Sequence, residues 1–225
     1  MTGARARRTR FTLAAALRPG RVALPRAPPY PADMQDDELL ETTVDRRVIH
    51  AGRYLTFRVD TIADARGGRH TRDWVEHPGA VAMVAVDSGD VLLVRQYRTP
   101  AARVLLEIPA GTLDRDATGA IEDPALAAPR ELGEETGFRA ASWRLLGRFF
   151  PAPGFASESM HLYLATDLSA IEGYAGPEPD ERIDLVRMPV RDAVAMADRG
   201  EIEDGKTLIG LFWLDRLLAR GEITA

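Results

Sequence analysis

The chain has 225 residues, 45% apolar and 28% charged, so we expect one domain, or one domain with an appendage, and exclude wholesale disorder. The absence of cysteine excludes disulfides and thiolate chemistry, and the four histidines are not spaced as zinc ligands on a helix, so a bound metal would be a hard cation on oxygen atoms. The net charge is −5, but residues 1–32 hold seven arginines and no acidic residue, which leaves −12 on the other 193 residues and argues against nucleic-acid binding.

The first predicted segment is a basic tail over residues 1–33. Its prolines, among them Pro25, Pro28 and Pro29, prevent a long regular element, so we expect the tail to be disordered. The longest apolar run, residues 13–17, is too short to span a membrane. A transit peptide also fits this composition, and Met34 begins an acidic stretch that could be the true start, with the tail an artefact of an upstream start. We expect a cytoplasmic protein without membrane association.

Short apolar segments follow, and their length and spacing predict strands. Val44, Val48 and then Tyr54, Phe57 and Val59 fit two strands, and the glycines at 67 and 68 predict a hairpin turn before a strand over 72–76. Apolar runs at 80–86 and 91–94 predict buried strands joined by a turn at 87–90. Further strands are expected at 104–108, 143–149, 160–165 and 183–188.

Three helices are predicted among these strands. Asp123 and Pro124 are suited to the N-cap and the first position of a central helix. The chain ends in helices over 190–199 and 207–218, the second of which repeats leucine at a spacing of three to four. Strands first, one central helix, more strands and terminal helices is the order of an α+β domain.

The central helix holds three carboxylates within five residues, Glu131, Glu134 and Glu135. Glu131 and Glu135 share one face, where like charges repel by roughly 0.2–0.5 kcal/mol. One interpretation is a solvated acidic face on which Arg130 pairs with Glu134. The other is a divalent cation site, because Mg²⁺ binds a few carboxylates together with phosphate oxygens and water.

The spacing over residues 111–138 resembles the Nudix box. In that family the box reads glycine, five residues, glutamate, seven residues, arginine–glutamate, an aliphatic residue, any residue, two glutamates, any residue, glycine, and an aliphatic or aromatic residue. The matching residues here are Gly111, Glu122, Arg130, Glu131, Leu132, Glu134, Glu135, Gly137 and Phe138. The resemblance covers roughly residues 40–220. It implies a Nudix-type α/β/α sandwich with a mixed sheet over 79–225, preceded by an N-terminal antiparallel strand region over 34–78.

The same resemblance implies roles for these residues. The metal ligands would be Glu131, Glu135 and the carbonyl of Ala110, with Mg²⁺ as the cation and Mn²⁺ as an alternative. Glu134 would lie close by as part of the catalytic set. Arg130 would belong to that set too, and with Glu122 it would brace the loop and the helix.

Two departures from the family pattern have structural consequences. Ten residues, not five, separate Gly111 from Glu122, which costs well under about 1 kcal/mol in loop closure. Pro129 lies inside the helix and removes one backbone hydrogen bond, at a cost of roughly 3 kcal/mol in a regular interior. We therefore expect a kink, or a helix that starts later than its cap residues suggest.

Flanking segments point to a subfamily. Residues 94–98 (VRQYR), 106–111 (LEIPAG) and 151–155 (PAPGF) resemble the ADP-sugar pyrophosphatases, which implies substrate contacts for Arg98 and Pro153. Pro153 follows Gly137 by sixteen residues, and an ordinary turn proline is the alternative. The resemblance also implies a base or an additional metal ligand in the loop 178–181. We choose Glu181, with Glu178 in reserve, although as plain sequence the loop could be a solvated turn.

The function implied is Mg²⁺-dependent hydrolysis of the diphosphate of ADP-ribose or a related ADP-sugar to AMP and a sugar phosphate. Glu181 would take the proton of the attacking water. The alternatives are another nucleoside diphosphate derivative or an oxidised nucleotide as substrate, or an ADP-ribose sensor without turnover.

A homodimer is also implied by the resemblance, with strands over 43–76 contributing to the partner's substrate site. Trp74 and Glu76 in that region would contact the adenine or the ribose. The alternative for Trp74 is packing within its own subunit, since an isolated tryptophan is usually buried for its area.

Overall fold

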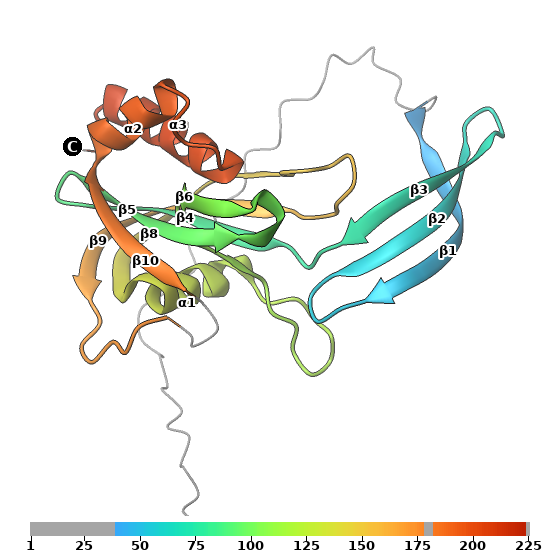
Figure 1. Cartoon of the computed structure of the whole chain (residues 1–225), viewed down its shortest axis with the longest axis horizontal. Coiled ribbons are helices and arrows are strands. Elements are labelled where there is room, and N and C mark those ends of the chain that lie inside the picture. Colours follow the sequence, from blue (N-terminus) through green and yellow to red (C-terminus); the bar gives the residue numbers. More distant parts are fainter. Residues whose placement is uncertain (1–38, 178–181, 224–225) are drawn as a thin grey trace, which may run out of the picture.

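The structure is a computed structural model, and it describes residues 39–177 and 182–223. These residues form an α+β fold, as predicted, with a small N-terminal sheet beside a larger body (Figure 1). The strands are β1 (Glu41–Ala51), β2 (Thr56–Asp64), β3 (Arg69–Glu76), β4 (Ala80–Asp87), β5 (Asp90–Arg98), β6 (Arg103–Glu107), β7 (Ala110–Thr112), β8 (Phe138–Phe149), β9 (Met160–Ala170) and β10 (Ile183–Pro189). The α-helices are α1 (Pro124–Thr136), α2 (Val190–Asp198) and α3 (Gly205–Ala219). The predicted basic tail, 1–33, lies outside the described residues.

The body is built on a mixed sheet of seven strands. Its main path runs β10-β5-β4-β9-β8, with β6 paired to β5 and β7 paired to β4. Only one of these pairings is parallel: β4 runs beside β9, with Ala80 opposite Met160. Helix α1 lies on one face of the sheet and helices α2 and α3 lie on the other, which is the expected α/β/α sandwich (Figure 1).

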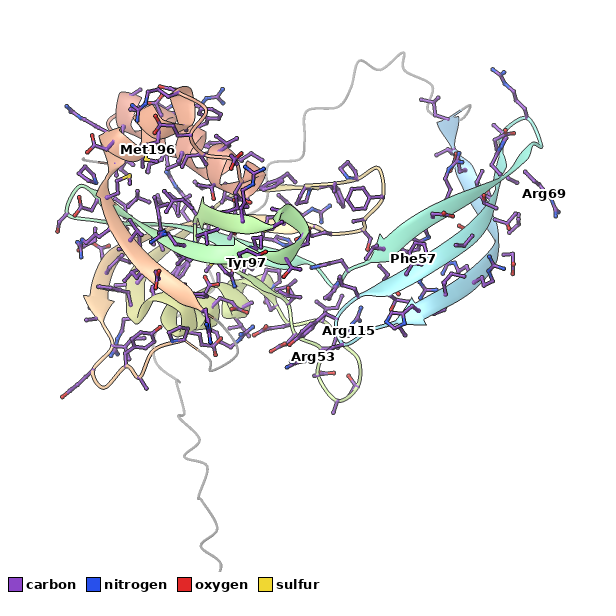
Figure 2. The ribbon with its side chains drawn as sticks, viewed as in Figure 1. Arg53, Phe57, Arg69, Tyr97, Arg115 and Met196 are labelled. Carbon is purple, nitrogen blue, oxygen red and sulfur yellow. The ribbon has the colours of Figure 1, made fainter. Side chains whose placement is uncertain are left out.

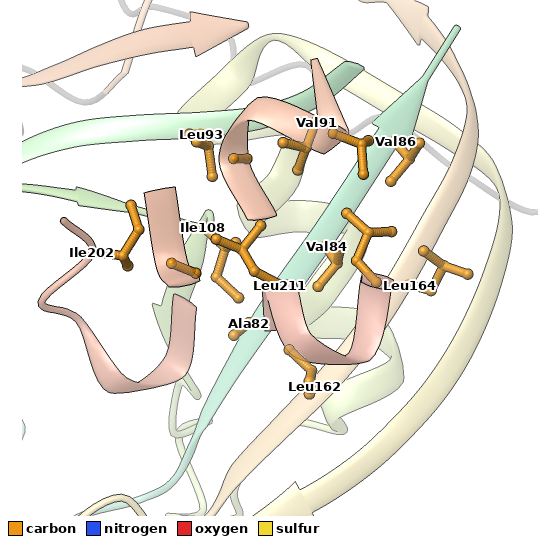
Figure 3. Close-up of a cluster of buried hydrophobic side chains, with 14 of the residues drawn as sticks. Ala82, Val84, Val86, Val91, Leu93, Ile108, Leu162, Leu164, Ile202 and Leu211 are labelled. Carbon is orange, nitrogen blue, oxygen red and sulfur yellow. The ribbon is translucent and has the colours of Figure 1, made fainter. Parts of the chain in front are cut away.

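Strand β4 is buried on both faces, and this explains its continuous apolar sequence. Ala82, Val84 and Val86 pack into the cluster beneath α2 and α3, which Figure 3 shows around Leu211. Val81 and Met83 point the other way, into the cluster with Leu132 of α1. Successive strand residues point to opposite faces, so a strand between two helical layers needs apolar residues at every position.

Helix α1 begins where its N-terminal cap residues predict. The Asp123 carboxylate accepts a hydrogen bond of 2.9 Å from the Ala125 N–H, and Pro124 takes the first helical position. Gly137 ends the helix with φ of 73°, and its N–H bonds the Gly133 carbonyl. A start later than the cap residues suggest, expected because of Pro129, is wrong: the helix begins at Pro124, and buried Ala127, Ala128 and Leu132 hold the turns around Pro129. The kink stays a prediction.

The N-terminal sheet is an antiparallel meander in the order β1-β2-β3. The predicted hairpin turn is present, with Gly67 at φ of 81°. Figure 1 shows this sheet to one side of the body. Backbone bonds join the end of β3 to the body, because the Val75 N–H bonds the Phe155 carbonyl at 2.7 Å and the Ser157 N–H bonds the Val75 carbonyl at 3.0 Å.

No helix in the described part of the chain is long and apolar enough to cross a membrane.

Candidate active site

An open pocket of about 790 Å³ lies where α1, the strand β7, the start of α3 and the β1–β2 turn meet. Its wall is rich in charge, and six of the ten charged side chains are acidic. They are Asp114, Glu131, Glu134, Glu135, Glu158, Asp204, Arg53, Arg98, Arg130 and Lys206. An anionic substrate in this pocket therefore needs additional positive charge.

Glu131 and Glu135 meet the chain at Ala110 and Gly111. The Ala110 N–H donates a 2.9 Å hydrogen bond to Oε2 of Glu135. A Cβ added at Gly111 would lie 1.9 Å from the Glu131 carboxyl carbon, so only glycine leaves room for this carboxylate. The structure thus brings together the three residues expected to bind metal, Ala110, Glu131 and Glu135, although the role of the Ala110 carbonyl stays a prediction.

These residues fit a cation that binds oxygen atoms and takes only a few of its ligands from the protein. Within residues 39–177 and 182–223, no group of three or more His, Asp or Glu side chains is placed to hold an ion together. Mg²⁺ commonly takes one or two carboxylates and completes its shell with water and substrate phosphate. Two carboxylates that approach the backbone at Ala110 and Gly111 match that donor set, and Mn²⁺ accepts the same ligands.

Arg130 organises the acidic residues around the helix. Its Nε and Nη2 donate to the two oxygens of Glu122 at 3.2 and 2.7 Å. Its Nη1 lies 2.9 Å from Oε1 of Glu131 and 2.8 Å from Oε2 of Glu134. The hydrogen bonds from Arg130 hold the pKa of Glu122 below its ordinary value, and the same contacts raise the pKa of Arg130. The expected Arg130–Glu134 pair is present, and Arg130 contacts Glu122 as well, while the bracing role of Glu122 stays a prediction.

Gly137 and Glu134 share a partner that sequence reasoning missed. The Tyr174 hydroxyl donates a 2.7 Å hydrogen bond to the Glu134 carbonyl. A Cβ on Gly137 would lie 2.5 Å from the Tyr174 ring, so glycine at this position is needed for close packing as well as for its positive φ. Tyr174 follows β9 and is far from the box in sequence, so no local pattern marks it.

Arg98 lies where it can meet a substrate, and a buried carboxylate holds it there. Its Nε and Nη2 donate to Glu107 at 2.8 and 2.7 Å, and Lys206 contacts the same carboxylate. Burial alone would raise the pKa of Glu107, but the hydrogen bonds and charges of Arg98 and Lys206 outweigh it and lower the pKa below 4.5. Arg98 was expected at the site from its sequence context, whereas Glu107 and Lys206 were not singled out.

His77 and Glu158 form another part of the wall. The Gly79 N–H donates to Nδ1 of His77 at 3.0 Å, so the proton of the neutral imidazole is on Nε2, which lies 4.0 Å from the Glu158 carboxylate. Burial lowers the pKa of His77, and the charge of Glu158 opposes this. Sequence reasoning missed both residues, because neither belongs to a local motif.

The structure does not bring every expected substrate residue to the pocket. The guanidinium carbon of Arg58 lies 5.8 Å from the centre of the Trp74 ring. Glu76 accepts hydrogen bonds from the same arginine at 2.7 and 3.0 Å. Trp74 and Glu76 do not line the pocket of this chain, and Pro153 is exposed, whereas Pro151 does line the pocket. Glu181, the expected base, and its alternative Glu178 lie outside the described residues.

The β1–β2 turn supplies residues that the sequence did not single out for the site. Arg53 and Tyr54 line the pocket, with the guanidinium 4.7 Å from the ring centre. Figure 2 shows Arg53 between the body and the N-terminal sheet. An aromatic ring with a cation beside it, both on the wall of a pocket lined by acidic residues, can pack against a planar ligand.

Comparison with family models matches residues 75–209 to the NUDIX domain, which is more than half of the chain. The chain belongs to the Nudix family. The Nudix box predicted over residues 111–138 therefore lies inside the matched region.

Several relatives align over most of this Nudix protein. It is 38% identical over 175 residues to the methanol dehydrogenase activator of Bacillus methanolicus, and this alignment covers 77% of this chain and 92% of the relative. It is 35% identical over 177 residues to the ADP-ribose pyrophosphatase of Bacillus subtilis, covering 78% and 93%. A crystal structure described as an ADP compounds hydrolase superposes with a TM-score of 0.68 at 22% identity, covering 81% of this chain and 97% of that one, which supports the fold.

Proposed function

We propose that this Nudix hydrolase cleaves the diphosphate of ADP-ribose or a related ADP-sugar, with Mg²⁺, to give AMP and a sugar phosphate. The observation that carries the proposal is the meeting of Glu131 and Glu135 with Ala110 and Gly111 inside a pocket of about 790 Å³. The similarity to a relative named ADP-ribose pyrophosphatase supports the choice of substrate class.

The proposed roles of the residues follow from their charges. Glu131 and Glu135 would hold the cation, which when bound supplies positive charge to the diphosphate and acidifies a water molecule. Arg98 lines the same pocket and can bind a phosphate oxygen through its guanidinium. Arg130 contacts Glu122, Glu131 and Glu134 and holds their carboxylates in place.

Hydrolysis requires that one water molecule adds to a phosphorus atom while the bridging P–O bond breaks. A carboxylate must take the proton of that water, and we assign this step to Glu181. Replacing Glu181 by Gln should lower kcat strongly with little change in KM, and Glu178→Gln is the matched control. Equal activity of Glu181→Gln and the wild type would show that another residue is the base.

The test of substrate class is a panel of nucleotides with Mg²⁺, scored for release of nucleoside monophosphate. The panel should contain ADP-ribose, another ADP-sugar, a GDP-sugar and an oxidised nucleoside triphosphate. The highest kcat/KM is expected for ADP-ribose or the ADP-sugar. A preference for the GDP-sugar or the triphosphate would refute the proposed substrate, and tight ADP-ribose binding without turnover would indicate a sensor.

We also propose that the protein is a homodimer joined through its N-terminal sheet. All eleven residues of β1 are exposed in the single chain, including Val44, Val48 and Ile49, and a small sheet with an open face is at best marginally stable alone. A twofold partner offers the same patch in return. Light scattering at micromolar concentration decides this point, because a 24.7 kDa particle would refute the dimer.

Sharing of sites between subunits needs a separate test. Inactive Glu135→Gln protein and Trp74→Ala protein, if the latter is also inactive, should be mixed and allowed to exchange subunits. Recovered activity is expected if Trp74 serves the partner's site. No recovery despite proven exchange would place Trp74 in its own subunit, where it packs under Arg58.

A further inference from the structure

Lys206 stands apart from all other basic residues of the chain. It is the only lysine among the 29 lysine and arginine residues of the sequence. It is the second residue of α3 and lines the pocket, yet its side chain is only 10% exposed. A long cationic side chain this deeply buried needs partners of opposite charge.

Two carboxylates surround its ammonium group. One is Glu107, whose side chain is 1% exposed, and the other is Asp204, the N-cap of α3, with Oδ2 at 3.1 Å. An ammonium is a compact charge with three donors, so it fits a narrow place where carboxylates of two elements meet. Lys206 therefore joins the end of β6 to the start of α3.

Glu107 binds Arg98 as well as Lys206. Arg98 donates from Nη2 to Oε2 of Glu107 at 2.7 Å, and Lys206 contacts the same oxygen. The Nε of Arg98 takes the other oxygen at 2.8 Å. A carboxylate bonded on both oxygens cannot rotate freely, so Lys206 limits the positions that the Arg98 guanidinium can adopt.

A second connection fixes the same segment of the chain. The Ile108 N–H donates a 2.8 Å hydrogen bond to the Thr207 hydroxyl, and both Thr207 and Ile108 are fully buried. The Asp204 carboxylate accepts a hydrogen bond of 2.9 Å from the Thr207 N–H. The first turn of α3 is thus anchored to the residues directly before Ala110 and Gly111.

We propose that Lys206 is a positioning residue of this active site: it holds Glu107, and through Glu107 it orients the Arg98 guanidinium toward the diphosphate of the substrate. This inference rests on the proposed function. Two cations and two carboxylates form the cluster, so its net charge is zero. Removing Lys206 leaves an uncompensated carboxylate beside the place where an anionic substrate must bind.

The first test compares steady-state kinetics of Lys206→Met with those of the wild type. Methionine keeps the length of the side chain and removes its charge and its donors. KM should rise about tenfold, the scale expected when a charge-assisted hydrogen-bond network is loosened, and kcat should change by less than about threefold. Arg199→Met is the matched control, because Arg199 makes an exposed ion pair with Glu201 away from the pocket. An unchanged KM, or an equal fall in kcat, would overturn the proposal.

The second test asks whether Lys206 acts through Glu107. Lys206→Met, Glu107→Gln and the double variant form a double-mutant cycle for KM. If Lys206 acts through Glu107, its substitution in the Glu107→Gln protein should add less than about twofold. Effects on KM that multiply would show that Lys206 acts independently and would overturn the positioning role.

The third test needs no turnover, and it covers the case in which Lys206→Met fails to fold. Protein labelled with ¹³C at lysine Cε has a single lysine signal, because the chain has one lysine. Arg98→Met and Glu107→Gln should each shift this signal, and Arg199→Met should not. An unshifted signal in Arg98→Met would refute the connection. If the wild type cleaves no nucleotide of the panel while the signal shifts, the proposed function fails and the Lys206–Glu107–Arg98 connection stands.

Discussion

Gly111→Ala is the most direct perturbation of the expected metal site. The new Cβ would lie 1.9 Å from the Glu131 carboxyl carbon and 2.2 and 2.3 Å from its oxygens. Ordinary contact begins at 3.4 Å, so the Glu131 carboxylate must move by about 1.5 Å, the difference between 3.4 and 1.9 Å. A misplacement of about 1 Å near the chemistry can cost about 10²-fold in rate, so kcat/KM should fall by at least that factor.

The fold should survive this substitution. Gly111 does not have a positive φ, and the clash is with the end of a flexible side chain, so Glu131 can swing away at little cost. We expect the melting temperature to change little while AMP release with Mg²⁺ falls. Gly147→Ala is the matched control, since its Cβ would meet nothing within 4 Å. Wild-type kcat/KM in Gly111→Ala would refute both the close approach and the role of Glu131.

Three further predictions follow from charge and composition. Glu135→Gln keeps an acceptor for the Ala110 N–H but removes the charge, so turnover should fall by orders of magnitude while circular dichroism shows an intact fold. The pKa of Glu107 in the folded protein is lowered from 4.5, so its ionised form stabilises the folded state above pH 4.5. This contribution is lost as the pH falls through the lowered pKa. The stability of Glu107→Gln should therefore fall less steeply below pH 4.5 than that of the wild type, as measured by acid unfolding. Deletion of residues 1–33 should leave melting temperature and activity unchanged, and a clear drop in either would show that this arginine-rich, proline-rich segment packs against the rest.

Local patterns predicted most elements, and long-range pairing explains where they failed. The strand expected at 143–149 begins at Phe138, because Gly137 turns the chain directly from α1 into β8. Strand β9 continues beyond the expected 165 to Ala170, because β8 pairs with it that far. The three-residue strand β7 was missed, since it is held by pairing with β4 and has no periodicity of its own.

The site residues, too, were predicted where they lie close together in sequence and missed where they come from distant segments. Helical spacing predicted the contact of Arg130 with Glu134. The connection between Arg130 and Glu122 was implied by the resemblance to the Nudix box. Lys206 and Tyr174 come from distant segments, and a lysine after an N-cap resembles the start of any helix. Such residues become visible only when the topology places α3 and the end of β9 beside the box.

The segment from Glu107 to Gly111 is held from both sides of the sheet. On one side, α1 contacts it through the Glu135–Ala110 hydrogen bond and the close approach of Glu131 to Gly111. On the other side, α3 contacts it through Lys206 and Thr207. If each side serves a different function, Gly111→Ala should act mainly on kcat and Lys206→Met mainly on KM, and their effects on kcat/KM should multiply. Effects that do not multiply, measured with folded proteins, would show that the segment responds as one rigid unit, so that displacing it from either side disturbs the metal ligands and Arg98 together.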